Sequence, residues 1–276
     1  MKVAILGCGY VGRTVGRYWS RDCNLDVVAT TTTPEKIPNL EAIGAIPRVL
    51  KGNDRPGLQK LLADREVLLL CMGASQSSYR ETYLETAKAL ISILPENSSL
   101  RQIIYTGSYA IYGNRQGQKV DETAAIHPQN EKEEILAQTE RVLLSASTSD
   151  RQVCIFRLGG IYGPDRELRK IFSRAAGKTL PGAGSEISNW IHLDDIVRAI
   201  DFARQHQLQG IYNLVDDDRC TRRELIDRVL SKHDLQPIVW DESQPSSRST
   251  NANVSNQKLK NAGYSFLHPY FFDRDV

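Results

Sequence analysis

The chain opens with glycines whose spacing is suited to binding a phosphate group. The apolar residues 3–6 run directly into the pattern G-x-G-x-x-G at residues 7–12. The first glycine permits a tight turn off a strand, the second has no side chain to block a pyrophosphate, and the third lets the following helix lie close to the strand. The N-terminus of that helix points free N–H groups at the phosphates. We therefore predict that a dinucleotide binds at Gly7, Gly9, Tyr10, Val11 and Gly12 rather than that these residues form a glycine turn without a ligand.

The end of the second apolar run bears on which dinucleotide binds. Residues 30–36 read TTTTPEK and follow the predicted strand at residues 26–30. An NAD site usually has an acidic residue here that accepts from the ribose 2′-hydroxyl, whereas threonine hydroxyls and a lysine suit a 2′-phosphate. We therefore favour NADP over NAD, with Thr31, Thr32 and Lys36 at the 2′-position. The alternative is that the threonines are β-prone residues that end a strand in a turn.

Two further strand ends are predicted to lie beside the glycine loop. Residues 67–72 form a buried apolar strand, and residues 102–106 form the next strand along the chain. In a doubly wound sheet the carboxyl ends of these strands lie next to the first glycine turn. We therefore add to the cofactor site Met72, Gly73, Ala74 and Thr106.

Composition excludes several other classes of protein. The formal net charge is +2 and no basic cluster stands out, so we expect no nucleic acid partner and no membrane surface as the main partner. The longest apolar run, residues 67–74, is too short to span a bilayer, and the N-terminus has no signal-peptide layout. The five cysteines are scattered and form no C-x-x-C pair, which favours reduced thiols in the cytoplasm and no metal site.

Strand-like and helix-like segments alternate through the first part of the chain. Predicted strands at residues 45–50 and 153–158 and predicted helices at residues 56–64, 79–94 and 131–145 complete this pattern. Such alternation is typical of an α/β fold with a doubly wound parallel sheet. We predict a Rossmann core at residues 1–158, completed by about 189–215. Residues 159–188 and 216–276 would then form a small C-terminal substrate lobe, in which residues 243–255 are polar and loop-like.

Five segments together resemble the extended short-chain dehydrogenases/reductases, the class that includes NAD-dependent epimerases and dehydratases. These segments are residues 7–12, 104–113, 156–164, 190–199 and 254–264. The resemblance covers nearly the whole chain and implies the Rossmann fold, a nicotinamide cofactor and hydride transfer.

The resemblance also indicates where catalytic residues are expected. Ser108 falls at the position of the family's catalytic serine, before the pair at residues 112–113. The family uses a tyrosine and a lysine four residues apart on the next helix to move the proton. When Glu140 is aligned with the family's glutamate, Lys132 takes the tyrosine position and Leu136 the lysine position. No Tyr-x-x-x-Lys occurs in the chain, which resembles an atypical branch that keeps the cofactor loop and lacks this pair.

Candidate replacements for the missing proton donor are Lys132, Tyr109 and His127. Lys132 has the simpler alternative of a solvated helix lysine among glutamates. On the substrate side we place Gly160, Tyr162 and His192, with packing or hydrogen bonding as the alternative role for His192.

The sequence therefore predicts an atypical, NADP-dependent oxidoreductase or epimerase-like enzyme that acts on a small substrate. The alternative is an NADP-binding sensor or regulatory protein that turns over weakly or not at all. We expect a monomer or a homodimer.

Overall fold

The computed structural model describes residues 1–96 and 99–271, and the chain divides into two compact units. Residues 1–108, 130–157 and 196–212 make up the first unit. Residues 109–129, 158–195 and those from 213 onward make up the second. Each unit is thus assembled from separate pieces of the chain.

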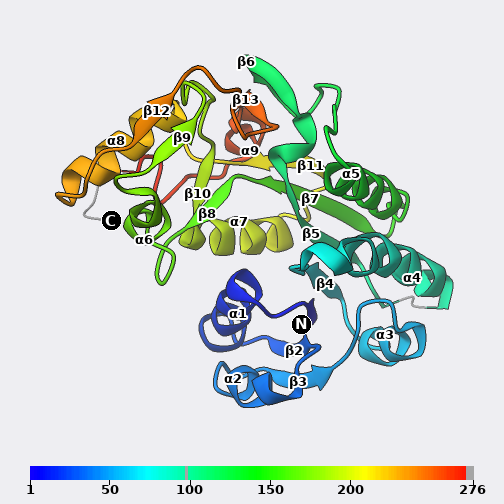
Figure 1. Cartoon of the computed structure of the whole chain (residues 1–276). Helices are drawn as coiled ribbons and strands as arrows, with labels where there is room; N and C mark the ends of the chain where they lie inside the picture. Colours follow the sequence, from blue (N-terminus) through cyan, green and yellow to red (C-terminus); the bar gives the residue numbers. More distant parts are fainter. Residues whose placement is uncertain (97–98, 272–276) are drawn as a thin grey trace. The chain divides into compact units, whose positions relative to one another are not determined.

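A seven-stranded sheet carries the first unit, and its strand order is β11-β7-β5-β4-β1-β2-β3 (Figure 1). The pairs β1–β2, β1–β4, β2–β3 and β4–β5 are all parallel. The strands are β1 (Lys2–Leu6), β2 (Asp26–Thr31), β3 (Ile46–Val49), β4 (Val67–Leu70), β5 (Gln102–Ser108), β7 (Gln152–Leu158) and β11 (Gly210–Leu214). Strand order reverses between β1 and β4, which is where a doubly wound sheet binds its ligand. The predicted fold class is confirmed.

Helices cover both faces of this sheet, which explains why the central strands are continuously apolar. The helices of this part of the chain are α1 (Tyr10–Arg17), α2 (Ile37–Glu41), α3 (Arg55–Leu62), α4 (Thr86–Ile93), α5 (Glu131–Leu144) and α7 (Leu193–Gln205). One apolar cluster joins α3, α4 and α5 to β1, β4, β5 and β7. On α7, Asp201 accepts a hydrogen bond from the Trp19 indole at 2.9 Å, and the Ala203 carbonyl accepts one from Gln102 at 2.7 Å. Within the described ranges, no helix is both long and apolar enough to cross a bilayer.

The beginning of α5 is fixed by its N-cap residue. The Asn130 side chain accepts a hydrogen bond from the Glu133 backbone N–H at 3.0 Å and donates one to the Glu133 carboxylate at 2.8 Å. Such a cap satisfies backbone N–H groups that the helix itself leaves unpaired. Lys132 therefore lies in the first turn of α5. This N-terminal end of the helix is the end that comes after the carboxyl ends of the strands.

Short parallel strand pairs organise the second unit. β8 (Gly160–Tyr162) pairs with β10 (Trp190–His192), β9 (Thr179–Pro181) with β12 (Val239–Asp241), and β6 (Asn114–Val120) with β13 (Asn251–Val254). The helices are α6 (Leu168–Phe172), α8 (Arg222–Lys232) and α9 (Gln257–Asn261). Aromatic rings of Tyr162, Trp190 and Phe271 form the middle of one apolar cluster. A capping box begins α8, in which Thr221 and Glu224 exchange hydrogen bonds.

The structure corrects one local expectation. Residues 251–254 form β13 rather than part of a loop, because their backbone pairs with β6 across a long sequence separation. At the start of α7, Asp194 lies in the first turn, and its backbone N–H donates to His192 Nδ1 at 3.1 Å.

Candidate cofactor and active site

The glycine loop is tightly packed at its ends and open at its middle. Gly7 has a φ of +92°, and a Cβ built on it would lie 2.7 Å from the Met72 Cα. A Cβ on Gly12 would lie 2.4 Å from the Gly7 carbonyl oxygen, so helix and strand approach closely there. A Cβ on Gly9 would meet nothing within 4 Å. Open space thus faces the Gly9 backbone, where the sequence predicts a pyrophosphate.

A cavity of about 420 Å³ lies at the carboxyl ends of β1, β2, β3 and β4, entirely within the first unit. The predicted cofactor residues that line it are Gly7, Gly9, Thr31, Thr32, Lys36, Met72 and Gly73. The lining does not include the other predicted cofactor residues, Tyr10, Val11, Gly12, Ala74 and Thr106. Thr106 instead donates from its hydroxyl to the Leu70 carbonyl at 3.3 Å, which ties β5 to β4.

The threonine tip of β2 has a defined internal structure. The Thr30 hydroxyl accepts from the Gly7 N–H at 3.1 Å, which links the tip to the glycine loop. The Thr31 hydroxyl accepts from the Thr33 N–H at 3.1 Å and donates to the Thr33 carbonyl at 3.3 Å, so it closes the turn. Thr32 and Lys36 are exposed and both line the cavity. These two residues are therefore exposed groups of the tip that are available to a ligand.

Sequence reasoning missed several polar residues of the same cavity, and Lys51, Asn53 and Glu81 form a connected group among them. Lys51 and Asn53 follow β3, and Glu81 follows the strand-to-helix loop after β4. The Glu81 carboxylate lies 3.6 Å from the Lys51 ammonium and accepts from the Asn53 amide at 3.3 Å. The sequence contains only one indication that these residues belong to the cavity, which is their position. Both segments follow the carboxyl ends of predicted parallel strands.

Cys8 lines the cavity as well, and its chemistry is that of a neutral thiol. Burial, followed by the neighbouring Cys71, raises the pKa of the Cys8 thiol to about 12. The thiolate is the reactive form of cysteine, and it is scarce at neutral pH at such a pKa. Cys8 therefore acts as a small loop residue here.

Two of the predicted catalytic residues belong to the first unit. Ser108 ends β5 and is half-buried. Lys132 is also half-buried, and its ammonium lies 5.8 Å from the centroid of the Tyr79 ring. Across residues 1–96 and 99–271, Lys132 forms no ion pair with the glutamates around it. Leu136, one turn further along α5, is buried with 5% of its surface exposed.

Comparison with known proteins places this arrangement in a family. A model of the NAD dependent epimerase/dehydratase family matches residues 3–214. Protein YeeZ of Escherichia coli (strain K12) is 30% identical over 220 residues, which cover 77% of this chain and 77% of that protein. The chain belongs to the NAD dependent epimerase/dehydratase family.

Solved structures of other proteins share the fold of this epimerase/dehydratase family member. The dTDP-glucose 4,6-dehydratase of Bacillus anthracis in complex with NAD aligns with a TM-score of 0.82 and 16% identity, covering 97% of this chain and 92% of that one. The UDP-glucose 4-epimerase of Thermus thermophilus in complex with NAD gives 0.79 and 18%, covering 98% and 96%. At such identities the likeness shows the fold alone.

The remaining candidates of this family member lie in the second unit. Tyr109 packs into an apolar cluster with Tyr112 and Val120. His127 is exposed, and its backbone N–H donates to the Ile111 carbonyl at 2.9 Å. This bond fixes the backbone at His127 and does not involve the imidazole ring.

The predicted substrate residues Gly160, Tyr162 and His192 meet at the β8–β10 pair. Tyr162 is opposite His192 in register, and their ring centroids are 5.1 Å apart. A Cβ on Gly160 would lie 2.8 Å from the Trp190 ring, so this glycine serves close packing. Burial, followed by the neighbouring His268, lowers the pKa of His192.

Three side chains beside this pair have atoms at spacings suitable for metal ligands. One ligand atom each from His192, Asp194 and His268 lies within 4.8 Å of the others. The Nδ1 atom of His192 is already the acceptor for the Asp194 N–H. The two imidazole rings overlap, with centroids 3.8 Å apart and 35° between their planes. Because a metal ion must lie near the plane of each imidazole, this geometry describes a stacked histidine pair.

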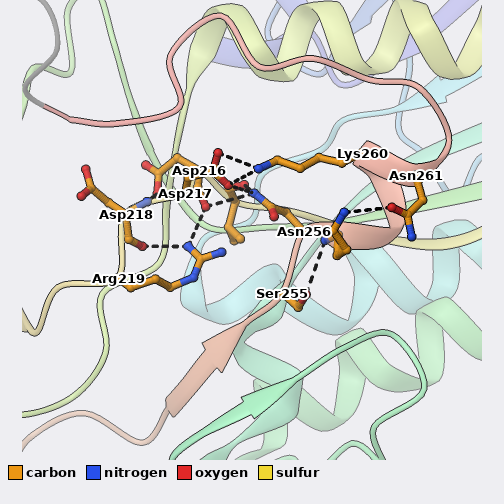
Figure 2. Close-up of polar contacts among 10 residues, drawn as sticks. Asp216, Asp217, Asp218, Arg219, Ser255, Asn256, Lys260 and Asn261 are labelled. Atoms are coloured by element: carbon orange, nitrogen blue, oxygen red, sulfur yellow. Dashed lines mark hydrogen bonds and ion pairs between the residues drawn. The ribbon is translucent and has the colours of Figure 1, made fainter.

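A polar cluster stabilises the loop that follows β11. Figure 2 shows Lys260 and Asn256 directed at Asp217, with Lys260 Nζ 2.5 and 2.6 Å from the two carboxylate oxygens. The Arg219 guanidinium donates to the carbonyls of Asp216 and Asp218, each at 2.7 Å. These contacts tie the loop to α9, which gives the cluster a structural role.

Proposed function

We propose that this member of the epimerase/dehydratase family is an NADP(H)-dependent oxidoreductase or epimerase-like enzyme that acts on a carbonyl or hydroxyl group of a small molecule. The observation that carries the proposal is the cavity at the glycine loop. Its middle glycine faces open space, and its rim at the end of β2 offers hydroxyls and a lysine. A dinucleotide fits such a site because its pyrophosphate needs exposed backbone N–H groups.

The charges around the cavity favour a 2′-phosphate. Lys36 and Lys51 both line it, and Glu81 is the carboxylate of its lining. That carboxylate already faces Lys51 and Asn53, as described above, whereas Lys36 makes no ion pair in the part of the chain that the structure describes. Glu35, in the same turn as Lys36, does not belong to the lining. Thr32 and Lys36 are therefore proposed to hold the 2′-phosphate.

When bound, the nicotinamide supplies or accepts a hydride. In this proposal Ser108 donates a hydrogen bond to the substrate oxygen from the end of β5. The partner is a small-molecule substrate rather than a nucleic acid or a membrane, and the protein acts in the cytoplasm as a monomer or homodimer.

Calorimetric titration of the full chain with NADP⁺ and NAD⁺ tests the cofactor preference. Two charge-assisted hydrogen bonds of ~1.5 kcal/mol each predict NADP⁺ binding about a hundredfold tighter than NAD⁺. Lys36→Met should weaken NADP⁺ about tenfold and leave NAD⁺ within about twofold. Lys60→Met, on the exposed face of α3, is the matched control. Equal dissociation constants for the two cofactors in the wild type would refute the NADP preference.

A second candidate function is supported by Leu136. A buried leucine occupies the position that the resemblance assigns to a lysine, and it has no charge to offer a ribose or a tyrosine. An NADP-binding sensor without turnover would need no such charge. Incubation with NADPH and a panel of aldehydes, ketones and nucleotide sugars separates the two functions, because a sensor binds the cofactor and consumes none.

A further inference from the structure

Two aromatic side chains follow the loop after β4, and they differ in how their hydroxyls are used. The rings of Tyr79 and Tyr83 have centroids 4.8 Å apart. The Tyr83 hydroxyl donates to the Met72 carbonyl at 3.3 Å. The Tyr79 hydroxyl makes no hydrogen bond to any residue that the structure describes, and the side chain is partly exposed. Tyr79 therefore presents a phenol that is available to a ligand.

Tyr79 comes from the same segment as residues of the cofactor cavity. Ser78, Glu81 and Thr82 line the cavity, and the loop before them contributes Met72 and Gly73. Tyr79 itself is not one of the lining residues; it belongs to the segment that borders the cavity, and all of these residues belong to the first unit.

The ammonium of Lys132, on α5, lies over the ring of Tyr79. This ammonium lies within the distance at which a cation is attracted to an aromatic ring. Arg80, the residue after Tyr79, lies 3.9 Å from the Glu131 carboxylate in an exposed ion pair between the same two segments. The α5 helix also packs against residues 81–85, directly after Tyr79.

We propose that Tyr79 is the proton donor of this site and that Lys132 is its positioning residue. The proposal rests on the NADP(H)-dependent function given above. A carbonyl carbon of the substrate accepts a hydride from the reduced nicotinamide, and its oxygen takes the proton of the Tyr79 hydroxyl. The O–H bond of Tyr79 breaks as the O–H bond of the alcohol forms, and a proton taken up from the solvent restores the phenol, so that the overall reaction consumes one proton. The products are the alcohol and the oxidised dinucleotide.

The surroundings of Tyr79 keep its proton in place until it is needed. Burial, followed by the Glu133 carboxylate, raises the pKa of Tyr79 above its usual value. The phenol is therefore protonated at neutral pH. The phenolate that forms after transfer carries a negative charge, and in this proposal the Lys132 ammonium, 5.8 Å from the ring centroid, stabilises that charge. Lys132 thus acts through Tyr79 and needs no contact with the substrate.

The test uses NADPH with the carbonyl substrate that the wild type reduces fastest in the panel. Tyr79→Phe should lower kcat by about 10²-fold or more, because general acid catalysis typically contributes ~10²–10⁴-fold. Its dissociation constant for NADPH, measured by calorimetry, should stay within about twofold of wild type, since the phenol gives its proton to the substrate. Tyr83→Phe is the control, because it disturbs the aromatic pair and leaves the Tyr79 hydroxyl in place.

A test of Lys132 as a positioning residue requires a measurement that a loss of packing alone would not change. Lys132→Met should lower kcat about tenfold with KM for the carbonyl substrate nearly unchanged, and Lys132→Arg should restore most of kcat because it restores the charge. Lys88→Met, an exposed lysine on α4, is the control.

The outcomes separate this inference from the proposed function. Wild-type turnover that is lost in Tyr79→Phe and retained in Tyr83→Phe supports the proton-donor role. Wild-type turnover that survives in Tyr79→Phe overturns the inference and leaves the oxidoreductase standing. A wild type that binds NADPH and reduces no member of the panel overturns the oxidoreductase itself, and the donor role with it.

Discussion

At the scale of single residues, the glycine loop offers a direct comparison between a glycine that leaves room for a ligand and one that serves packing. Gly9 and Gly12 belong to one motif, yet an added Cβ meets open space at the first and a backbone oxygen at the second. The same substitution should therefore have different consequences at the two positions.

Gly9→Ala should fold with wild-type stability, and Gly9→Asp should fold but lose most dinucleotide binding through clash and charge repulsion with the pyrophosphate. Gly12→Ala should destabilise the first unit by about 1–3 kcal/mol, because backbone must shift to admit the methyl group. Urea unfolding and calorimetric titration measure the two effects. If Gly9→Asp were well folded and bound NADP⁺ as tightly as wild type, the cofactor site would lie elsewhere.

Some features of single residues in the site could be predicted from the sequence, and others could not. The glycine loop was predictable because strand, turn and helix follow one another within a short stretch. The approach of Lys132 to Tyr79 was not, since the two residues are far apart in the chain and their contact depends on how α5 packs. The internal hydrogen bonds of Thr31 escaped prediction as well, because a threonine run gives no sign of which hydroxyl closes the turn.

At the scale of elements, a buried ion pair joins α5 to β7. The Arg157 guanidinium donates to the Glu140 carboxylate at 2.8 and 3.2 Å, and each side chain is 4% exposed. Burial raises the pKa of Glu140, and Arg157 opposes this effect. Removing one partner of such a pair leaves a buried charge without compensation.

Glu140→Leu should therefore lower the free energy of unfolding of the first unit by about 3–5 kcal/mol. The double variant Glu140→Leu/Arg157→Met should recover a large part of that loss, because no charge remains buried. The exposed pair Glu85–Lys88, with oxygen and nitrogen 2.9 Å apart, is the control, and Glu85→Gln should cost less than about 1 kcal/mol. A double variant as unstable as Glu140→Leu would argue against charge burial as the cause.

The strands differ in how well they can be predicted from their own sequences. The apolar run of β4 has all its residues buried, so composition alone predicted a central strand. β6 and β13 carry polar residues and are partly exposed, and their pairing partner is distant in sequence. Local patterning carries no information about such a pair, which explains why residues 251–254 were expected to be loop.

At the scale of the whole molecule, the two units should respond differently to acid. His192 is buried in the second unit, and its pKa is lowered by burial and by His268, while Asp194 and Asp195 oppose the shift. Because an unfolded chain protonates this histidine at its ordinary pKa of about 6.5, the folded state loses stability as pH falls through that value. Protonation also places charge against the stacked ring of His268.

Hydrogen exchange between about pH 7.5 and about pH 5 should show this loss in residues 190–192 and 264–268 before it appears in β1 and β4. His192→Asn, which keeps an acceptor for the Asp194 N–H, should reduce the acid sensitivity of the second unit. His206→Asn, an exposed histidine of the first unit, should leave it unchanged. Equal acid sensitivity of the wild type and His192→Asn would place the responsible group elsewhere.

The β6–β13 pair has a consequence for the order in which the protein is made. β6 leaves the ribosome early, and its partner follows only after nearly half the length of the chain. By the time residue 212 has been synthesised, every segment of the first unit is present. The second unit still waits for β13, so the backbone of β6 must bond to water or to a chaperone in the nascent chain. The first unit is therefore expected to fold during translation, and the second to assemble last.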